Sequence, residues 1–110
     1  MIIPDTYHMF LAGTGPNALG RLHGDFIAIF QFADAGKEVE PILHKGVDSQ
    51  RVLPGDGKID LKGYLTSLKK TGFDGCVSLE LYNPEYRKRE PVAFLEEALR
   101  KTVKVVASVG

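Results

Sequence analysis

The chain has 110 residues, and its 14 basic and 14 acidic side chains give a formal net charge of zero. A neutral chain offers no basic surface for nucleic acid. Its apolar runs are far shorter than the roughly 20 residues that a membrane span needs, and no secretory signal pattern is visible. The single cysteine, Cys76, cannot form an internal disulfide, which favours a reducing cytoplasm. We therefore expect a folded cytoplasmic domain that binds neither nucleic acid nor membrane.

In chain order, the first half predicts a strand that ends at Asp5, a short helix within residues 13–20, and a buried strand over residues 26–32. The segment 26–32 is apolar on both faces, which is typical of a parallel strand covered on both sides. Residues 34–58 hold six glycines and prolines and predict a long loop of functional importance.

The second half alternates helix, strand and helix. Asp60 is a candidate N-cap for a helix that stops before Gly72, and residues 76–81 have strand-like alternation. Pro91 suits the first turn of a last helix, in which Glu97 and Lys101 form a pair on the solvent side. The stripe expected to be buried consists of Leu95, Ala98, Leu99, Thr102, Val103 and Val106. This order of elements predicts an α/β fold with a parallel sheet.

Three polar residues, Asp5, Gln31 and Glu80, come at the carboxyl ends of predicted strands, where α/β proteins place their chemistry. Asp5 with His8 suits a divalent metal, and the alternative is an ordinary turn. Gln31 is either a ligand or an amide that bonds loop backbone. Glu80 suits a metal ligand and a proton-transfer base, or else forms a salt bridge.

The segment Arg51-Val52-Leu53-Pro54-Gly55-Asp56-Gly57 predicts a tight loop that presents one guanidinium. An arginine in such a loop is suited to bidentate recognition of a carboxylate or a phosphate. The alternative for Arg51 is a surface turn leading into the helix after Asp60.

Taken together, these segments resemble the C-terminal part of the sugar phosphate isomerase/epimerase family with the xylose isomerase-like TIM barrel. The resemblance spans nearly the whole chain and rests on five stretches. They are Asp5-Thr6-Tyr7-His8, residues 30–35, residues 51–60, residues 72–80 and Asn83-Pro84-Glu85-Tyr86. It implies one partial barrel domain over residues 1–110, truncated at its N-terminus and comprising about strands six to eight of a (β/α)8 barrel.

The resemblance also implies a site and a reaction. A divalent ion (Mn, Zn, Co or Mg) would be held by Asp5, Gln31 and Glu80, together with a glutamate from strand four that this chain lacks. His8 and Arg51 would contact a small sugar or polyol ketone. Glu80 would move a proton in the isomerisation or epimerisation of a keto-sugar or inosose through a cis-enediolate. We expect the 110 residues alone to be inactive, because a complete barrel needs about 250.

Two alternatives remain beside the isomerase. Gln31 stands where the family commonly has histidine, and members that resemble 3-dehydroshikimate dehydratases also carry glutamine there, which suggests a metal-dependent dehydratase. The other alternative is a non-catalytic fragment that docks to a partner half-barrel. An unpaired strand edge would favour that docking or the formation of a homo-oligomer.

Overall fold

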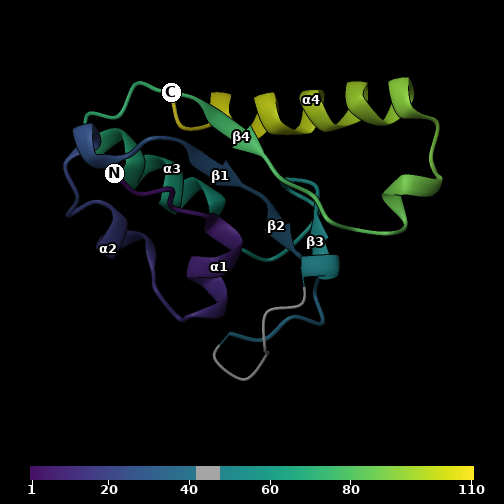
Figure 1. Cartoon of the computed structure of the whole chain (residues 1–110), viewed down its shortest axis with the longest axis horizontal. Helices are drawn as coiled ribbons and strands as arrows, with labels where there is room; N and C mark the ends of the chain where they lie inside the picture. The colour runs from purple at the N-terminus through teal and green to yellow at the C-terminus, as the bar shows by residue number, and fades with distance from the viewer. Residues whose placement is uncertain (42–47) are drawn as a thin grey trace.

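The computed structural model describes residues 1–41 and 48–110 (Figure 1). Helices and short strands alternate through these ranges, which confirms mixed α/β content. The elements are α1 (Thr6–Leu11), α2 (Pro16–Leu19), η1 (Gly24–Phe26), β1 (Phe30–Phe32), β2 (Asp34–Ala35), η2 (Asp48–Gln50), β3 (Arg51–Val52), α3 (Leu61–Lys70), β4 (Val77–Leu79), η3 (Tyr86–Lys88) and α4 (Pro91–Ala107). Among the described residues, no helix is long and apolar enough to cross a membrane.

A parallel sheet with β1 in the middle forms the centre of the fold. β1 pairs in parallel with β4 on one side, and the two strands run beside each other in Figure 1. On the other side of β1, parallel bridges join Ile2 to Ile27 and Asp5 to Gln31. Because parallel strands end at the same edge of a sheet, Asp5, Gln31 and the Glu80 that follows β4 are brought to one edge.

The apolar core lies on one face of this sheet. Phe30 and Phe32 of β1 are fully buried and join one cluster with the leucines of α3. That helix begins after its predicted cap, because Asp60 Oδ1 accepts a hydrogen bond from Gly63 N at 3.0 Å. On the opposite face, Ile29 is 38% exposed. The prediction of one strand over residues 26–32 that is covered on both faces is therefore wrong, since β1 spans only Phe30–Phe32 and Phe26 lies in η1.

Helix α4 begins at Pro91 as predicted but packs through a different face from the predicted one. Most of the predicted stripe is exposed to solvent: Leu95, Leu99, Val103 and Val106. Ala98 is buried, and Val105 and Val109, which lie outside that stripe, pack against the core. The stripe prediction is wrong because α4 has apolar residues in adjacent rows, and periodicity alone does not decide which row meets a partner.

A chain of ion pairs ties α4 to the loop after β3. Lys101 Nζ lies 2.9 Å from Glu97 Oε1 and 2.6 Å from Asp56 Oδ2, and Arg89 pairs with Glu97. Hydrogen bonds from Arg89 and Lys101 lower the pKa of Glu97 to about 2. Hydrogen bonds to Asp56 and Glu97 raise the pKa of Lys101. The Glu97–Lys101 pair forms as predicted, but it faces the loop and not open solvent.

Asp34 organises the segment predicted as a long loop. Its carboxylate is 1% exposed and accepts hydrogen bonds from the backbone nitrogens of Gly55, Gly57 and Ile59 at 2.9–3.1 Å. Gly57 is required there, because a Cβ would collide with the carbonyl oxygen of Ala35. Within its described residues, the segment contains β2 and β3, which pair antiparallel. Residues 42–47 of the predicted loop lie outside the described residues.

We predict that Asp34→Ala destabilises the chain by about 3 kcal/mol, because several buried N–H groups lose their acceptor. Asp34→Asn keeps one acceptor oxygen, so its stability should lie between that of Asp34→Ala and that of the wild type. The measurement is urea unfolding followed by circular dichroism, with exposed Asp74→Ala as the control. An Asp34→Ala midpoint equal to that of the control would contradict the role of Asp34.

A pH effect follows from Glu97, whose pKa lies below its ordinary value of 4.5 in the folded chain. Ionised Glu97 stabilises the folded state above about pH 4.5, and that contribution is lost as the pH falls toward about 2. Urea midpoints measured at pH 7 and pH 3 should therefore differ less for Glu97→Gln than for the wild type. Glu96→Gln, on an exposed position of the same helix, should behave like the wild type. Equal pH dependence in all three chains would exclude this contribution.

Candidate metal and substrate site

Asp5 stands where the first parallel segment passes into α1, and it serves both structure and site. Its Oδ1 accepts hydrogen bonds from Tyr7 N at 2.8 Å and His8 N at 3.1 Å, so it caps α1, a helix that the sequence analysis did not predict. The cap fixes the orientation of a carboxylate that is only 4% exposed. Its Oδ2 takes part in none of these cap bonds and faces Arg51.

Arg51 is a buried cation at the centre of the site. Its side chain is 1% exposed, and Nη1 lies 3.1 Å from Asp5 Oδ2. Its Nη2 lies 3.3 Å from Asp48 Oδ1 and 3.8 Å from Glu80 Oε2. The guanidinium carbon lies 4.7 Å from the centre of the Tyr7 ring. Burial of a guanidinium is costly unless acids surround it, and three acids meet that requirement here.

Gln31 joins the two acids contributed by its neighbouring strands. The end of its amide that faces them lies 3.2 Å from both Glu80 Oε2 and Asp5 Oδ2. With its nitrogen there, the amide donates a hydrogen bond to each acid. With its oxygen there, Gln31 completes a set of three oxygen donors, which is the chemistry that hard divalent cations prefer. The three residues predicted as metal ligands therefore converge at one point.

This donor set fits a divalent cation by its chemistry. Two carboxylates share a place that requires positive charge, which Arg51 supplies in the structure, and the amide of Gln31 lies between them. Within the described ranges, no group of three or more His, Cys, Asp or Glu side chains gathers as a metal cluster. The role of Asp5, Gln31 and Glu80 as metal ligands therefore stays a prediction.

His8 lies at the outer rim of the site. Its side chain is 59% exposed, and Nε2 lies 3.1 Å from Arg51 Nη2 and 4.0 Å from Asp48 Oδ1. The structure therefore brings His8 and Arg51 beside the three predicted ligands. His8 is accessible from solvent, whereas Arg51 is enclosed.

Three further residues contribute to the site without a sequence pattern that predicts their role. Asp48 pairs with Arg51 from one side, and no sequence pattern marks it. Asn83 Nδ2 donates a hydrogen bond to the carbonyl oxygen of Arg51 at 3.0 Å, and Leu53 N donates one to the Tyr86 hydroxyl at 3.0 Å. Burial raises the pKa of that hydroxyl. The loop after β4 thus fixes the backbone of β3 and with it the position of the guanidinium.

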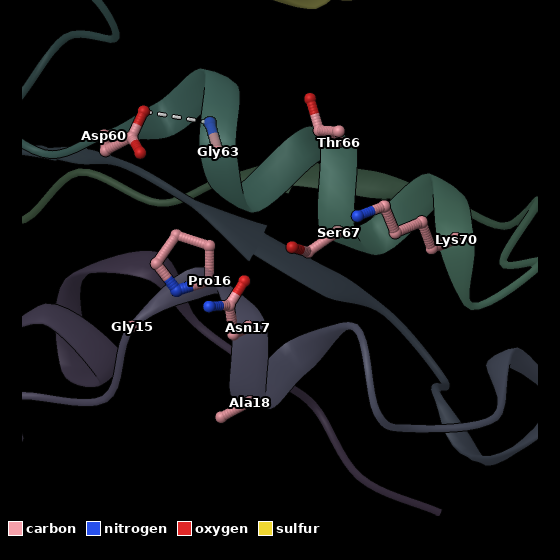
Figure 2. Close-up of a pocket in the computed structure, with 9 residues that line it drawn as sticks. All are labelled: Gly15, Pro16, Asn17, Ala18, Asp60, Gly63, Thr66, Ser67 and Lys70. Carbon is pink, nitrogen blue, oxygen red and sulfur yellow. Dashed lines mark hydrogen bonds between the residues drawn. The ribbon is translucent and has the colours of Figure 1, made fainter.

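A hollow lies away from this site, between α2 and α3 (Figure 2). It has a volume of about 610 Å³ and is lined by side chains of the two helices, among them Asn17, Ser67 and Lys70. The Asp60 carboxylate at its end is engaged by Gly63 N, as the dashed line in Figure 2 marks. None of the five predicted site residues lines this hollow, so size alone does not locate the chemistry.

The fold and this arrangement of strand-end residues define the class of the protein. The chain belongs to the xylose isomerase-like TIM barrel family, whose model matches residues 1–102. It is 36% identical over 106 residues to the inosose isomerase of Bacillus subtilis (strain 168), covering 96% of this chain and 37% of that protein. It is 34% identical over 90 residues to a 3-dehydroshikimate dehydratase of Pseudomonas putida, covering 78% of this chain and 13% of that protein.

A solved structure supports the same family assignment. The IOLI protein, crystallised with a binding zinc atom, superposes with a TM-score of 0.89 at 34% identity, over 99% of this chain and 38% of that one. The chain therefore spans well under half the length of the curated relatives that it matches.

We predict that Arg51→Met destabilises the chain by about 3 kcal/mol, because Asp5 is left buried without its cation. Adding Asp5→Asn should recover part of that loss, since asparagine still caps α1 and carries no charge. Urea unfolding measures both, and Arg100→Met on an exposed position of α4 is the matched control. If Arg51→Met lowers the free energy of unfolding no more than the control does, the ion pair does not stabilise the fold.

Proposed function

We propose that this chain forms the C-terminal portion, about strands six to eight, of a barrel enzyme that isomerises or epimerises a keto-sugar or inosose with a divalent metal. The observation that carries the proposal is the convergence of Asp5, Gln31 and Glu80 at one edge of a parallel sheet. The inosose isomerases of three Bacillus strains, each 34–36% identical to this chain over 106 residues, support this substrate class.

The metal would be held by the carboxylates of Asp5 and Glu80 and the amide oxygen of Gln31. Zinc is the metal bound in the crystal structure of the IOLI protein, and Mn, Co and Mg suit the same oxygen donors. When bound, such an ion polarises the carbonyl of the substrate and stabilises the enediolate. A glutamate from the missing part of the barrel would complete the ligand set.

The side chains of this chain would perform the remaining steps. Glu80 is 27% exposed and held beside Gln31, so its carboxylate can reach the substrate and move a proton at the carbon next to the carbonyl. Arg51 is enclosed and paired with Asp5, so in place of the predicted substrate contact it would hold the Asp5 carboxylate in position. His8 at the exposed rim is placed to contact a hydroxyl group.

A metal-dependent dehydratase is the second candidate. Two 3-dehydroshikimate dehydratases of Pseudomonas species are 34% and 30% identical to this chain, and the same site would serve them. Proton removal next to a carbonyl is common to both reactions, and they differ in the group that leaves afterwards. We also propose a cytoplasmic location, because the single cysteine, Cys76, is a free thiol.

The proposed function is tested in a covalent chimera that joins the part of the Bacillus subtilis inosose isomerase outside the 106 matched residues to this chain. With Mn²⁺, Co²⁺ or Zn²⁺ added, we expect isomerisation of inosose, followed by NMR. Glu80→Gln should lower turnover by about 1,000-fold through loss of the proton carrier. Glu96→Gln, an exposed glutamate of α4, is the matched control.

Three results would contradict the isomerase. Turnover of Glu80→Gln within a few-fold of the parent would remove Glu80 from the reaction. Consumption of 3-dehydroshikimate in place of inosose would favour the dehydratase. A folded chimera that converts neither compound would leave the non-catalytic alternative as the correct one.

A further inference from the structure

His8 and Arg51 meet through two nitrogen atoms, which restricts where the imidazole proton can be. Arg51 Nη2 lies 3.1 Å from His8 Nε2, which is a hydrogen-bond distance. A guanidinium has five N–H donors and no acceptor, so Arg51 can only donate in this contact. His8 Nε2 therefore accepts, and an imidazole nitrogen accepts only when it carries no proton.

The opposite arrangement, with the proton on His8 Nε2, is disfavoured by the distances around that nitrogen. Asp48 Oδ1, the carboxylate oxygen that faces it, lies 4.0 Å away, which is too far for a hydrogen bond. Two N–H groups directed at each other across 3.1 Å would repel. Donation from Arg51 to His8 is therefore favoured over donation from His8 to Asp48.

Arg51 cannot turn away from His8, because its other donors are engaged on two sides. Nη1 donates to both carboxylate oxygens of Asp5, at 3.3 and 3.1 Å. Nε and Nη2 donate to Asp48 Oδ1 at 3.4 and 3.3 Å. The planar guanidinium is thus held in one orientation, and the second N–H of Nη2 is left for His8.

The other ring nitrogen of His8 is available to a ligand. Among the residues that the structure describes, none forms a hydrogen bond with His8 Nδ1, and the side chain is 59% exposed. In a neutral imidazole, one nitrogen carries the proton when the other accepts a hydrogen bond. His8 therefore presents an N–H donor, Nδ1–H, at the rim of the site.

We propose that Arg51, held in place by Asp48, fixes His8 as the Nδ1–H tautomer, so that His8 meets the substrate as a hydrogen-bond donor. The substrate contact rests on the proposed function, whereas the tautomer does not. Asp48 is then a positioning residue that acts through Arg51. A hydroxyl or carbonyl oxygen of the substrate suits this donor, whereas the ammonium group of an amino sugar would face a second donor.

The test is a long-range 1H–15N NMR spectrum of the 15N-labelled chain at about pH 8, where an ordinary imidazole is neutral. The 15N shifts of the two ring nitrogens show which one carries the proton, and His8→Gln assigns the His8 signals. We expect the Nδ1–H form of His8 to exceed the Nε2–H form about tenfold. His23 is the internal control, because its Nδ1 accepts from Asp25 N at 3.3 Å and its proton should lie on Nε2.

Arg51→Lys keeps a positive charge for Asp5, but its single amine ends one bond short of Nη2 and should not reach His8. In this variant we expect His8 to change to mainly the Nε2–H form, while His23 is unaffected. If Arg51→Lys does not fold, Asp48→Ala, at a position 49% exposed, replaces it and should shift the tautomer in the same direction. A wild-type His8 in the Nε2–H form, or a tautomer that the folded variant leaves unchanged, would overturn the proposal.

The donor role is measured in the covalent chimera, through the kcat/KM for inosose. His8→Asn places an amide nitrogen near the position of Nδ1 and should lower kcat/KM about 3-fold, whereas His8→Gln places it near Nε2 and should lower it about 30-fold. Equal losses in the two variants would exclude the donor role. An inactive chimera would refute the proposed function, whereas the tautomer is measured on the chain itself and without turnover.

Discussion

The buried pair between Arg51 and Asp5 is the interaction on which the rest of the site depends. It joins β3, in the middle of the chain, to the end of the first parallel segment, and both partners are almost fully removed from solvent. A buried charge is tolerated only where its partners are fixed. Hydrogen bonds hold both partners in place. The backbone at the start of α1 donates to Asp5, while Asn83 and Tyr86 bond the backbone around Arg51.

That pair also sets the electrostatics at the edge of the sheet. Asp5 and Glu80 lie on either side of Gln31, and two acids so close together require a cation. The guanidinium provides positive charge from the loop side. The amide between the acids can donate to them or present its own oxygen to a metal. In the proposed isomerase, this arrangement would hold a divalent ion.

The same geometry explains why the sheet has unpaired edges. A parallel sheet brings its strand ends together only by leaving its outer strands with one unpaired edge each, unless the sheet closes on itself. The described sheet does not close, and apolar side chains of α4 remain exposed, among them Leu95, Leu99 and Val103. The chain covers 37% of the Bacillus subtilis relative.

The sequence by itself determined the local features, including the cap at Asp60, the start of α4 at Pro91 and the polar residues near the strand ends. These depend on contacts within a few residues, and the family resemblance supplied the expectation that the strand ends meet. Only the tertiary structure decided which row of α4 is buried, that Asp34 holds the central loop, and that Asp48 faces Arg51. Each of these features depends on a neighbour that is distant in sequence or on a local geometry that no motif predicts. A pattern of residue types does not specify which residues become neighbours in space.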